Sequence, residues 1–177
     1  RFFNNKRSGF YVDIGAHHPK RFSNTYKFYK KGWRGINIDA MPGSMINFVK
    51  ERSRDINLEL GISNVKGEMD FYCFDEPALN SFSKEIAEER NQTYKIVQVV
   101  KVPIYTLAEI LDKYLPKEVK VIDFLTIDVE GLDYEVLQSN NWRKYKPEFI
   151  LIEHYDFKVE ELNIYPGFLL LAKEGYE

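Results

Sequence analysis

The sequence predicts an α/β fold, an open and mostly parallel sheet with helices on both faces, as a single domain over residues 1–177. Three observations predict it. Apolar runs of strand length alternate with stretches of helical periodicity, several of those runs end in an acidic residue, and a glycine turn follows the first of them. With 177 residues, 44% of them hydrophobic, the chain is long enough to bury one full core.

The first strand and its glycine turn are the most informative segment. Residues 9–14 are apolar apart from Asp13, and Gly15-Ala16 follow at once. An acid at a strand's carboxyl end can accept hydrogen bonds from a ligand's hydroxyls or amine, and a glycine lets the backbone approach that ligand. The second strand, 35–39, repeats the design and ends in Asp39, where a carboxylate can grip both hydroxyls of a ribose.

The other segments continue the alternation of strands and helices. In order, we expect a helix from Ser23 to Gly32, a helix from Pro42, an alternating strand at 56–62 turning into an antiparallel extension at 68–74, a strand at 96–102, a helix opened by a capping box at Thr106–Glu109, a buried strand at 121–128, a helix after Gly131, a strand at 149–154 and a last helix from Pro166.

Residues 75–95 interrupt this regularity. They are rich in Glu, Asn and Ser and have little periodicity. We interpret them as a lid or substrate loop, either mobile or containing a short solvated helix over the ligand face.

Polar residues end four of the expected strands. In an open α/β sheet the carboxyl ends of the strands meet where ligands bind, at the point where strand order reverses. If the strand order is 3-2-1-4-5, that point lies between the strands ending at Asp13 and Asp128. The polar residues expected to converge there are Asp13, Asp39, Asp128, Glu130, Glu153 and His154.

The glycine turn also narrows the choice of nucleotide. His17-His18-Pro19 stand where a G-x-G-x-x-G loop has its later glycines, which disfavours pyrophosphate binding. A triphosphate loop of the form G-x-x-x-x-G-K-[ST] is absent from the sequence. A ribonucleoside without phosphates fits better, and S-adenosylmethionine is the common one.

Five segments together resemble the FkbM-type methyltransferases. They are Tyr11-Val12-Asp13-Ile14-Gly15-Ala16, Ser23-Asn24-Thr25, residues 31–39, Phe124 to Gly131, and Ile150-Leu151-Ile152-Glu153-His154. The resemblance implies a class I, Rossmann-like fold that uses S-adenosylmethionine and methylates a hydroxyl on a sugar, a glycan or a small natural product. It also implies a final hairpin, which has no counterpart after Gly175-Tyr176-Glu177 in this sequence.

The resemblance assigns roles to individual residues. Asp13, Gly15 and Ala16 would border the methionine end of the cofactor, and Asp39 its ribose. The remaining residues that it places at the cofactor are Asn24, Thr25, Ala40, Ile62, Ser63 and Asp128, of which Ile62 and Ser63 lie on the adenine side.

An alcohol acceptor needs a base to take its proton. His154 is one candidate near neutral pH, and Glu130 or Asp128 would serve if burial raises its pKa. The acids Asp128, Glu130 and Glu153 with His154 also have the composition of a hard metal site, but their spacing is not diagnostic and we predict no metal.

Composition limits the other classes of partner. The net charge of −2 disfavours nucleic acid and anionic lipid as partners. The single cysteine, Cys73, rules out an internal disulfide, and we interpret it as a packed strand residue. Without an apolar run long enough for a bilayer, we expect a cytoplasmic protein with a small-molecule or carbohydrate acceptor. The alternatives are an NAD(P)-binding oxidoreductase and a non-catalytic nucleoside-binding relative.

Overall fold

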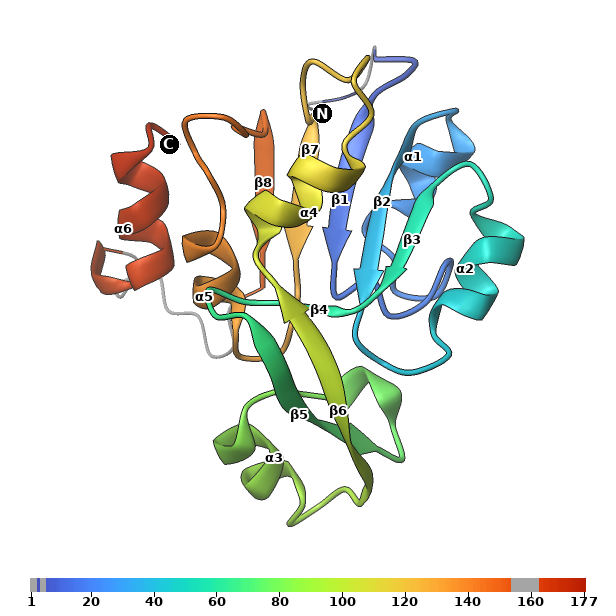
Figure 1. Cartoon of the computed structure of the whole chain (residues 1–177), viewed down its shortest axis with the longest axis vertical. Helices are drawn as coiled ribbons and strands as arrows, with labels where there is room; N and C mark the ends of the chain where they lie inside the picture. The colour runs from blue at the N-terminus through green and yellow to red at the C-terminus, as the bar shows by residue number, and fades with distance from the viewer. Residues whose placement is uncertain (1–2, 4–5, 154–162) are drawn as a thin grey trace.

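Five parallel strands form the main sheet of the structure, a computed structural model that describes residues 3, 6–153 and 163–177. The strand order is β3-β2-β1-β7-β8 (Figure 1). Counted within this sheet alone, that is the predicted order 3-2-1-4-5, and the α/β fold class is confirmed. The strands are β1 (Phe10–Ile14), β2 (Arg34–Asp39), β3 (Ile56–Glu59), β7 (Phe124–Ile127) and β8 (Phe149–Ile152).

β1 lies at the centre of this sheet, and all five of its residues are buried. Val12 is paired with Ile36 of β2 on one side and with Leu125 of β7 on the other. A strand covered on both faces reads as a nearly continuous apolar run, which explains the composition of β1 and β7. The one charged residue in β1, Asp13, therefore stands out as a buried polar group.

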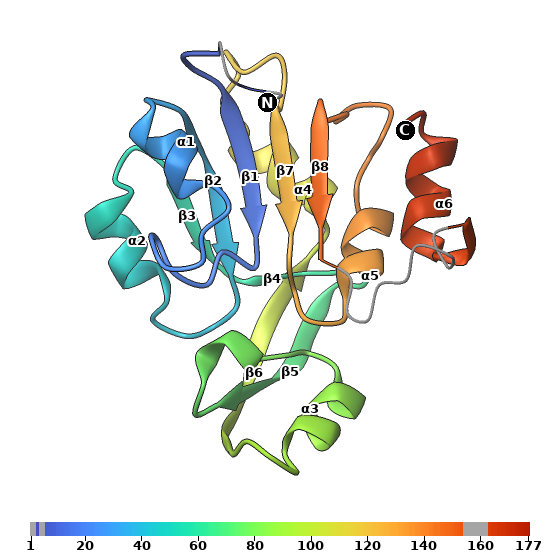
Figure 2. The same cartoon turned by 180° about the vertical axis from the view of Figure 1, so that it is seen from behind.

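Helices cover both faces of the main sheet. In Figure 1, α4 lies in front of the strands, whereas in Figure 2, the view from behind, α1 is in front. The predicted capping box is confirmed, since Thr106 and Glu109 exchange hydrogen bonds at the start of α4. The helices are α1 (Tyr26–Lys30), α2 (Met45–Glu51), α4 (Leu107–Tyr114), α5 (Asp133–Gln138) and α6 (Pro166–Lys173).

A second sheet lies beyond the carboxyl ends of the main strands, at the bottom of Figure 1. It consists of β4 (Gly61–Ile62), β6 (Ile96–Tyr105) and β5 (Gly67–Phe74) in that order. β4 is parallel to β6, and β5 is antiparallel to β6. The expected hairpin between 56–62 and 68–74 is therefore wrong: the partner of β5 is β6.

The alternating segment 56–62 is also not one strand. Leu60 donates its N–H to the carbonyl of Asp39 at 3.0 Å, and the chain then leaves β2 to pair with β6 as β4. Gly61 permits this change of sheet, because a Cβ there would lie 2.4 Å from Ile104 and 2.7 Å from Phe82. The apolar residues Ile56, Leu58, Leu60 and Ile62 all pack in or against the main core, but β3 and β4 pair with two different sheets.

Residues 75–95 contain a 3₁₀ turn, η1 (Pro77–Leu79), and a short helix, α3 (Lys84–Arg90). Ser83 caps α3 by accepting from the N–H of Ile86. Both views show α3 beside the second sheet, beyond the strand ends. This segment is thus the short-helix form of the two expected; its action as a lid stays a prediction.

Trp33 and Cys73 are both buried. Trp33 lies beyond the end of α1 at Lys30, fully buried and stacked on Phe28. Cys73 is buried in β5 as a free cysteine, as expected for a packed residue, and burial raises the pKa of its thiol.

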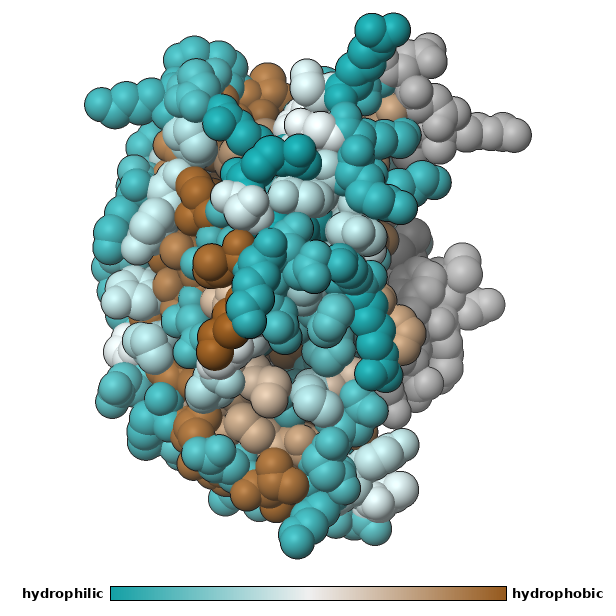
Figure 3. Space-filling view, turned by 90° about the vertical axis from the view of Figure 1, so that its right-hand side faces the viewer, coloured by the Kyte–Doolittle hydropathy of each residue, from teal (hydrophilic) through white to brown (hydrophobic). Residues whose placement is uncertain are grey.

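The face of the molecule next to α2 carries scattered apolar residues. Ile46 and Val49 of α2 are both exposed. Figure 3 shows hydrophobic residues on this face separated by hydrophilic ones. This face therefore offers no continuous apolar docking surface among the residues that the structure describes.

Candidate functional site

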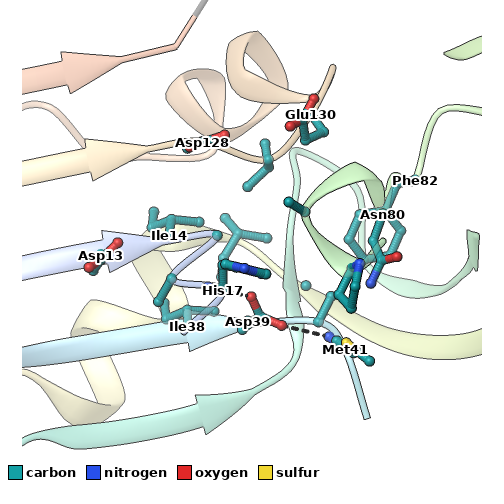
Figure 4. Close-up of a pocket in the computed structure, with 18 of the residues that line it drawn as sticks. Asp13, Ile14, His17, Ile38, Asp39, Met41, Asn80, Phe82, Asp128 and Glu130 are labelled. Atoms are coloured by element: carbon teal, nitrogen blue, oxygen red, sulfur yellow. Dashed lines mark hydrogen bonds between the residues drawn. The ribbon is translucent and has the colours of Figure 1, made fainter. Parts of the chain in front are cut away.

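A cavity of about 220 Å³ opens where the main strands end and the second sheet begins (Figure 4). Its walls come from β1 and β2, the loops after β1, β2 and β7, β4, Phe71 of β5 and the segment around η1. The lining residues on which the site depends are Asp13, Gly15, Ala16, His17, Asn24, Asp39, Ala40, Met41, Ile62, Asn80, Phe82, Asp128, Glu130 and Glu153.

Gly15 forms the tightest point of this wall. Its φ is +79°, and a Cβ at this position would lie 1.7 Å from the carbonyl oxygen of Asp128. The N–H groups of Gly15 and Ala16 both donate to the carbonyl of Ile38, at 2.9 and 3.0 Å. The turn is therefore held against β2 on one side and against the β7 exit on the other, in a place that only glycine fits.

Asp39 ends β2 and borders the cavity next to that turn. Its Oδ2 accepts from the N–H of His17 at 2.8 Å, and its Oδ1 accepts from the N–H of Met41 at 2.8 Å. Figure 4 shows the carboxylate between these two residues. Burial raises the pKa of this carboxyl, and the two backbone N–H groups oppose the rise. Each oxygen keeps a second lone pair for a ligand hydroxyl.

Asp13 lies deeper, on β1. It is almost completely buried, and this burial raises its pKa to about 6. Its Oδ2 accepts from the hydroxyl of Thr25 at 2.5 Å. Among the described residues, no side chain or backbone group donates to its Oδ1. One oxygen of a buried carboxylate in the cavity wall is thus left for a ligand.

Asn24 and Thr25, the two residues before α1, differ in whether they line the cavity. Asn24 is exposed, lines the cavity and donates to the Thr126 hydroxyl at 3.1 Å. Thr25 is fully buried and does not line the cavity, because its side chain turns inward to Asp13. Direct contact of Thr25 with a ligand, as the resemblance implied, is therefore not what the structure shows.

Of the two residues predicted on the adenine side, one lines the cavity and the other does not. Ile62 lines the cavity, whereas Ser63 is buried outside it, with its N–H bonded to the carbonyl of Tyr105. The apolar wall here is completed by residues that the sequence did not single out. These are Met41, Leu60, Phe71, Ala78 and Phe82. The sequence feature that could have indicated this wall is Phe82, an aromatic residue within the mostly polar segment 75–95.

Three carboxylates form a cluster at the exits of β7 and β8. Asp128, Glu130 and Glu153 each offer an oxygen within 4.8 Å of the others. Burial and the Glu153 carboxyl together raise the pKa of Asp128 to about 8. Glu130, at a φ of +54°, forms an ion pair with Arg90 of α3. The spacing would suit a hard cation, although Arg90 already supplies one positive charge to the cluster.

His154, the third candidate base, lies outside the described residues. Of the other two histidines, His17 lines the cavity and has a φ of +52°. His18 points into its own turn, where its Nδ1 accepts from the N–H groups of Lys20 and Arg21, and burial lowers its pKa. The loop after β1 thus places one imidazole, that of His17, at the cavity.

A second cavity, of about 580 Å³, adjoins the first between β8 and α6. The two share four lining residues: Phe22, Asn24, Asp128 and Glu153. The rest of the second lining is mostly apolar, from Ile127, Leu151, Ile152, Tyr165, Phe168 and Leu171. The shared carboxylates, Asp128 and Glu153, therefore stand at the boundary between two adjoining cavities.

The family model described as the methyltransferase FkbM domain matches residues 13–177. No curated protein and no solved structure matches the chain. Among the described residues, no helix has both the length and the apolar character needed to span a bilayer. Because the family model covers nearly the whole chain, this protein belongs to the FkbM family of methyltransferases.

Proposed function

We propose that the protein is an S-adenosylmethionine-dependent O-methyltransferase whose acceptor is a hydroxyl of a sugar, a glycan or a small natural product. One arrangement carries the proposal. The Gly15 turn and the Asp39 carboxylate border the same cavity, at the switch point of a parallel sheet. Membership of a methyltransferase family supplies the reaction class.

The cavity residues fit such a cofactor. Asp39 has free lone pairs for the two ribose hydroxyls, and Asp13 has a free oxygen for the ammonium of the methionine end. Ala40, Met41, Ile62 and Phe82 supply an apolar wall for the adenine. A bound S-adenosylmethionine would provide a methyl group already activated by its sulfonium, so the protein mainly has to align the acceptor and manage its proton.

The pair Asp128 and Glu153 is the base that we propose for that proton. The raised pKa of Asp128, about 8, matches a group that exchanges a proton near neutral pH. Glu130 is a weaker candidate because Arg90 neutralises it. His154 follows Glu153 directly in the chain and stays a prediction.

The second cavity is where we place the acceptor. It meets the cofactor cavity at Asp128 and Glu153, so an acceptor hydroxyl held there would lie beside the proposed base. Its aromatic side chains, Phe22, Tyr165 and Phe168, suit the apolar face of a sugar ring or of a natural product. A small-molecule or carbohydrate acceptor is therefore preferred over nucleic acid.

Calorimetry tests the cofactor. We expect S-adenosylmethionine and S-adenosylhomocysteine to bind and NAD not to bind, because His17-His18-Pro19 occupy the place of the pyrophosphate glycines. Failure of the first two to bind would contradict the proposal, and binding of NAD alone would favour the oxidoreductase. Binding of S-adenosylmethionine without methyl transfer to a panel of sugars and natural products would favour a non-catalytic relative.

Asp39→Ala should weaken S-adenosylhomocysteine binding at least tenfold, since two ribose hydroxyls lose a charged acceptor. Asp70→Ala is the matched control. That carboxylate is exposed on β5 and pairs with Lys101, away from the cavity lining. Equal affinities for Asp39→Ala and Asp70→Ala would remove Asp39 from the binding site.

The affinity should also depend on pH through Asp13. The ionised carboxylate binds an ammonium, and burial raises the pKa of Asp13 to about 6. Protonation below that pH removes the attraction, so affinity for S-adenosylhomocysteine should fall by up to about tenfold per pH unit below 6 and be constant above 7. 5′-Methylthioadenosine, which lacks the amino-acid end, is the control at each pH. The ratio of the two affinities should follow the Asp13 titration; a ratio independent of pH between 5 and 7 would contradict the assignment.

A further inference from the structure

Arg52 is a fully buried cation that directly follows α2. Its guanidinium lies 5.2–5.8 Å from the ring centres of four aromatic residues, Tyr11, Phe48, Tyr26 and Tyr29. Removing a charge from water is costly unless partners compensate it. The partners that compensate the Arg52 charge therefore indicate which residues this side chain positions.

Those contacts lead toward the cofactor cavity. Arg52 Nη2 donates to the hydroxyl of Thr25 at 2.6 Å and to that of Ser23 at 3.2 Å. Its Nε lies 3.8 Å from Asp55 Oδ2 and has no hydrogen-bond partner among the described residues. The shorter of these two hydrogen bonds is the one to Thr25.

The direction of the hydrogen bond between Thr25 and Asp13 follows from the donors and acceptors of the three side chains. A guanidinium has donors only, so the Thr25 hydroxyl must accept from Arg52. That hydroxyl has a single proton, which is then directed to Asp13 Oδ2, 2.5 Å away. Arg52, Thr25 and Asp13 thus form one ordered chain that fixes the rotation of the Asp13 carboxylate and leaves Oδ1 for a ligand.

The charges around this chain are unbalanced. Two buried carboxylates, Asp13 and Asp55, face one buried guanidinium. With both acids ionised, the group carries a net charge of −1, which a cationic ligand group would neutralise. An ammonium would meet that need at Oδ1 of Asp13, a carboxylate that lines the cavity and whose other oxygen is held by Thr25.

We propose that Arg52 and Thr25 are positioning residues for the amino-acid end of the cofactor: Arg52 orients the Thr25 hydroxyl, and this hydroxyl holds Asp13 so that Oδ1 receives the ammonium. The inference rests on the proposed function. Neither residue lines the cavity, so both act through Asp13 and not by contact with the ligand.

The test compares two neutral nucleosides by calorimetry at pH 7.5. S-Adenosylhomocysteine has the amino-acid end, and 5′-methylthioadenosine lacks it. Thr25→Val removes the hydroxyl but keeps the shape, and Thr25→Ser keeps the hydroxyl. We expect Thr25→Val to weaken S-adenosylhomocysteine about tenfold or more and to change 5′-methylthioadenosine less than twofold. Thr25→Ser should stay within about threefold of the wild type for both.

Arg52→Lys tests the first link of the chain. It keeps the charge but loses the fork of donors, so the selectivity for S-adenosylhomocysteine over 5′-methylthioadenosine should fall. If Arg52 acts through Thr25, this loss should disappear when Arg52→Lys is made in the Thr25→Val background. An equal loss in both backgrounds would remove Arg52 from the chain.

The remaining outcomes separate the two levels of proposal. If the wild type binds neither nucleoside, the proposed function fails and this inference fails with it. If the wild type binds both and Thr25→Val weakens both equally, or neither, the proposed function stands and the positioning role is overturned. Thermal unfolding of each variant without ligand shows whether it is folded; if Arg52→Lys does not fold, the Thr25 pair decides.

Discussion

Gly15→Ala is expected to destabilise the protein by about 2–5 kcal/mol and to abolish cofactor binding. Two costs add up. A residue with a Cβ pays about 1–2 kcal/mol for the left-handed backbone at φ +79°, and the Cβ would stand 1.7 Å from the Asp128 carbonyl oxygen, so β1 and β7 must separate at their exits. Urea unfolding gives the free energy, and calorimetry with S-adenosylhomocysteine gives the affinity.

Gly43→Ala is the matched control for this prediction. Gly43 has nearly the same φ, +81°, but a Cβ there would meet nothing closer than Ile46 Cδ1 at 3.8 Å. It should cost only about 1–2 kcal/mol, the backbone part, and leave binding intact. If the two substitutions cost the same, the close approach of Gly15 to Asp128 is not what requires a glycine.

Asp128→Asn is expected to raise the stability of the ligand-free protein at pH 8 while lowering methyl transfer by 10²-fold or more. In the folded state, burial and Glu153 raise the pKa of Asp128 from 3.8 to about 8. A raised pKa favours the protonated, folded form, so this group stabilises the wild type below pH 4 and loses that contribution as the pH rises toward 8. Asparagine does not titrate, and the variant avoids this loss.

The expected difference between Asp128→Asn and wild type is therefore small at pH 5 and on the order of 1–2 kcal/mol at pH 8, discounted because Asp128 is partly exposed. Thermal unfolding at both pH values measures it. Glu153→Gln is the companion variant, since removing either carboxylate ends the repulsion. A variant less stable than wild type at pH 8 would show that the two acids do not oppose each other.

The loss of transfer in Asp128→Asn follows from the proposed base. General-base groups contribute about 10²–10⁴-fold to rate, and an amide cannot take the acceptor's proton. Labelled methyl donor with a panel of sugars and natural products measures the loss. Glu130→Gln should lower transfer less, because Arg90 already holds that carboxylate. The reverse order would move the role of base to Glu130.

Much of the main sheet could be read from local pattern. The central strands β1 and β7 are short, buried throughout and followed by a turn, so apolar runs and their terminal acids mark these strands directly. Asp13, Gly15, Asp39 and Asp128 all reach the cavity because parallel strands end at one edge. That placement depends only on the direction of the strands. Helical connections between successive strands make the strands parallel.

The second sheet could not be read in the same way. The alternation at 56–62 predicts buried side chains and is silent about which sheet buries them. The pairing of β5 with β6 spans the loop 75–95, and nothing local in 68–74 identifies so distant a partner. Phe82 and Asn80 reach the cavity for the same reason, since their place depends on where the second sheet rests.

By itself, the sequence determined the alternation of strands and helices and the glycine turn at the carboxyl end of β1, because these follow from periodicity and from residues adjacent in the chain. The family followed from the resemblance of five segments, and the strand order from the fold class that this resemblance implies. Only the tertiary structure decided how the acids are used. Thr25 turns inward to Asp13, Arg52 lies behind it, and Arg90 neutralises Glu130. The physical reason is that burial and charge partners are set by contacts between residues far apart in sequence, and these determine each carboxylate's pKa and which of its oxygens stay free.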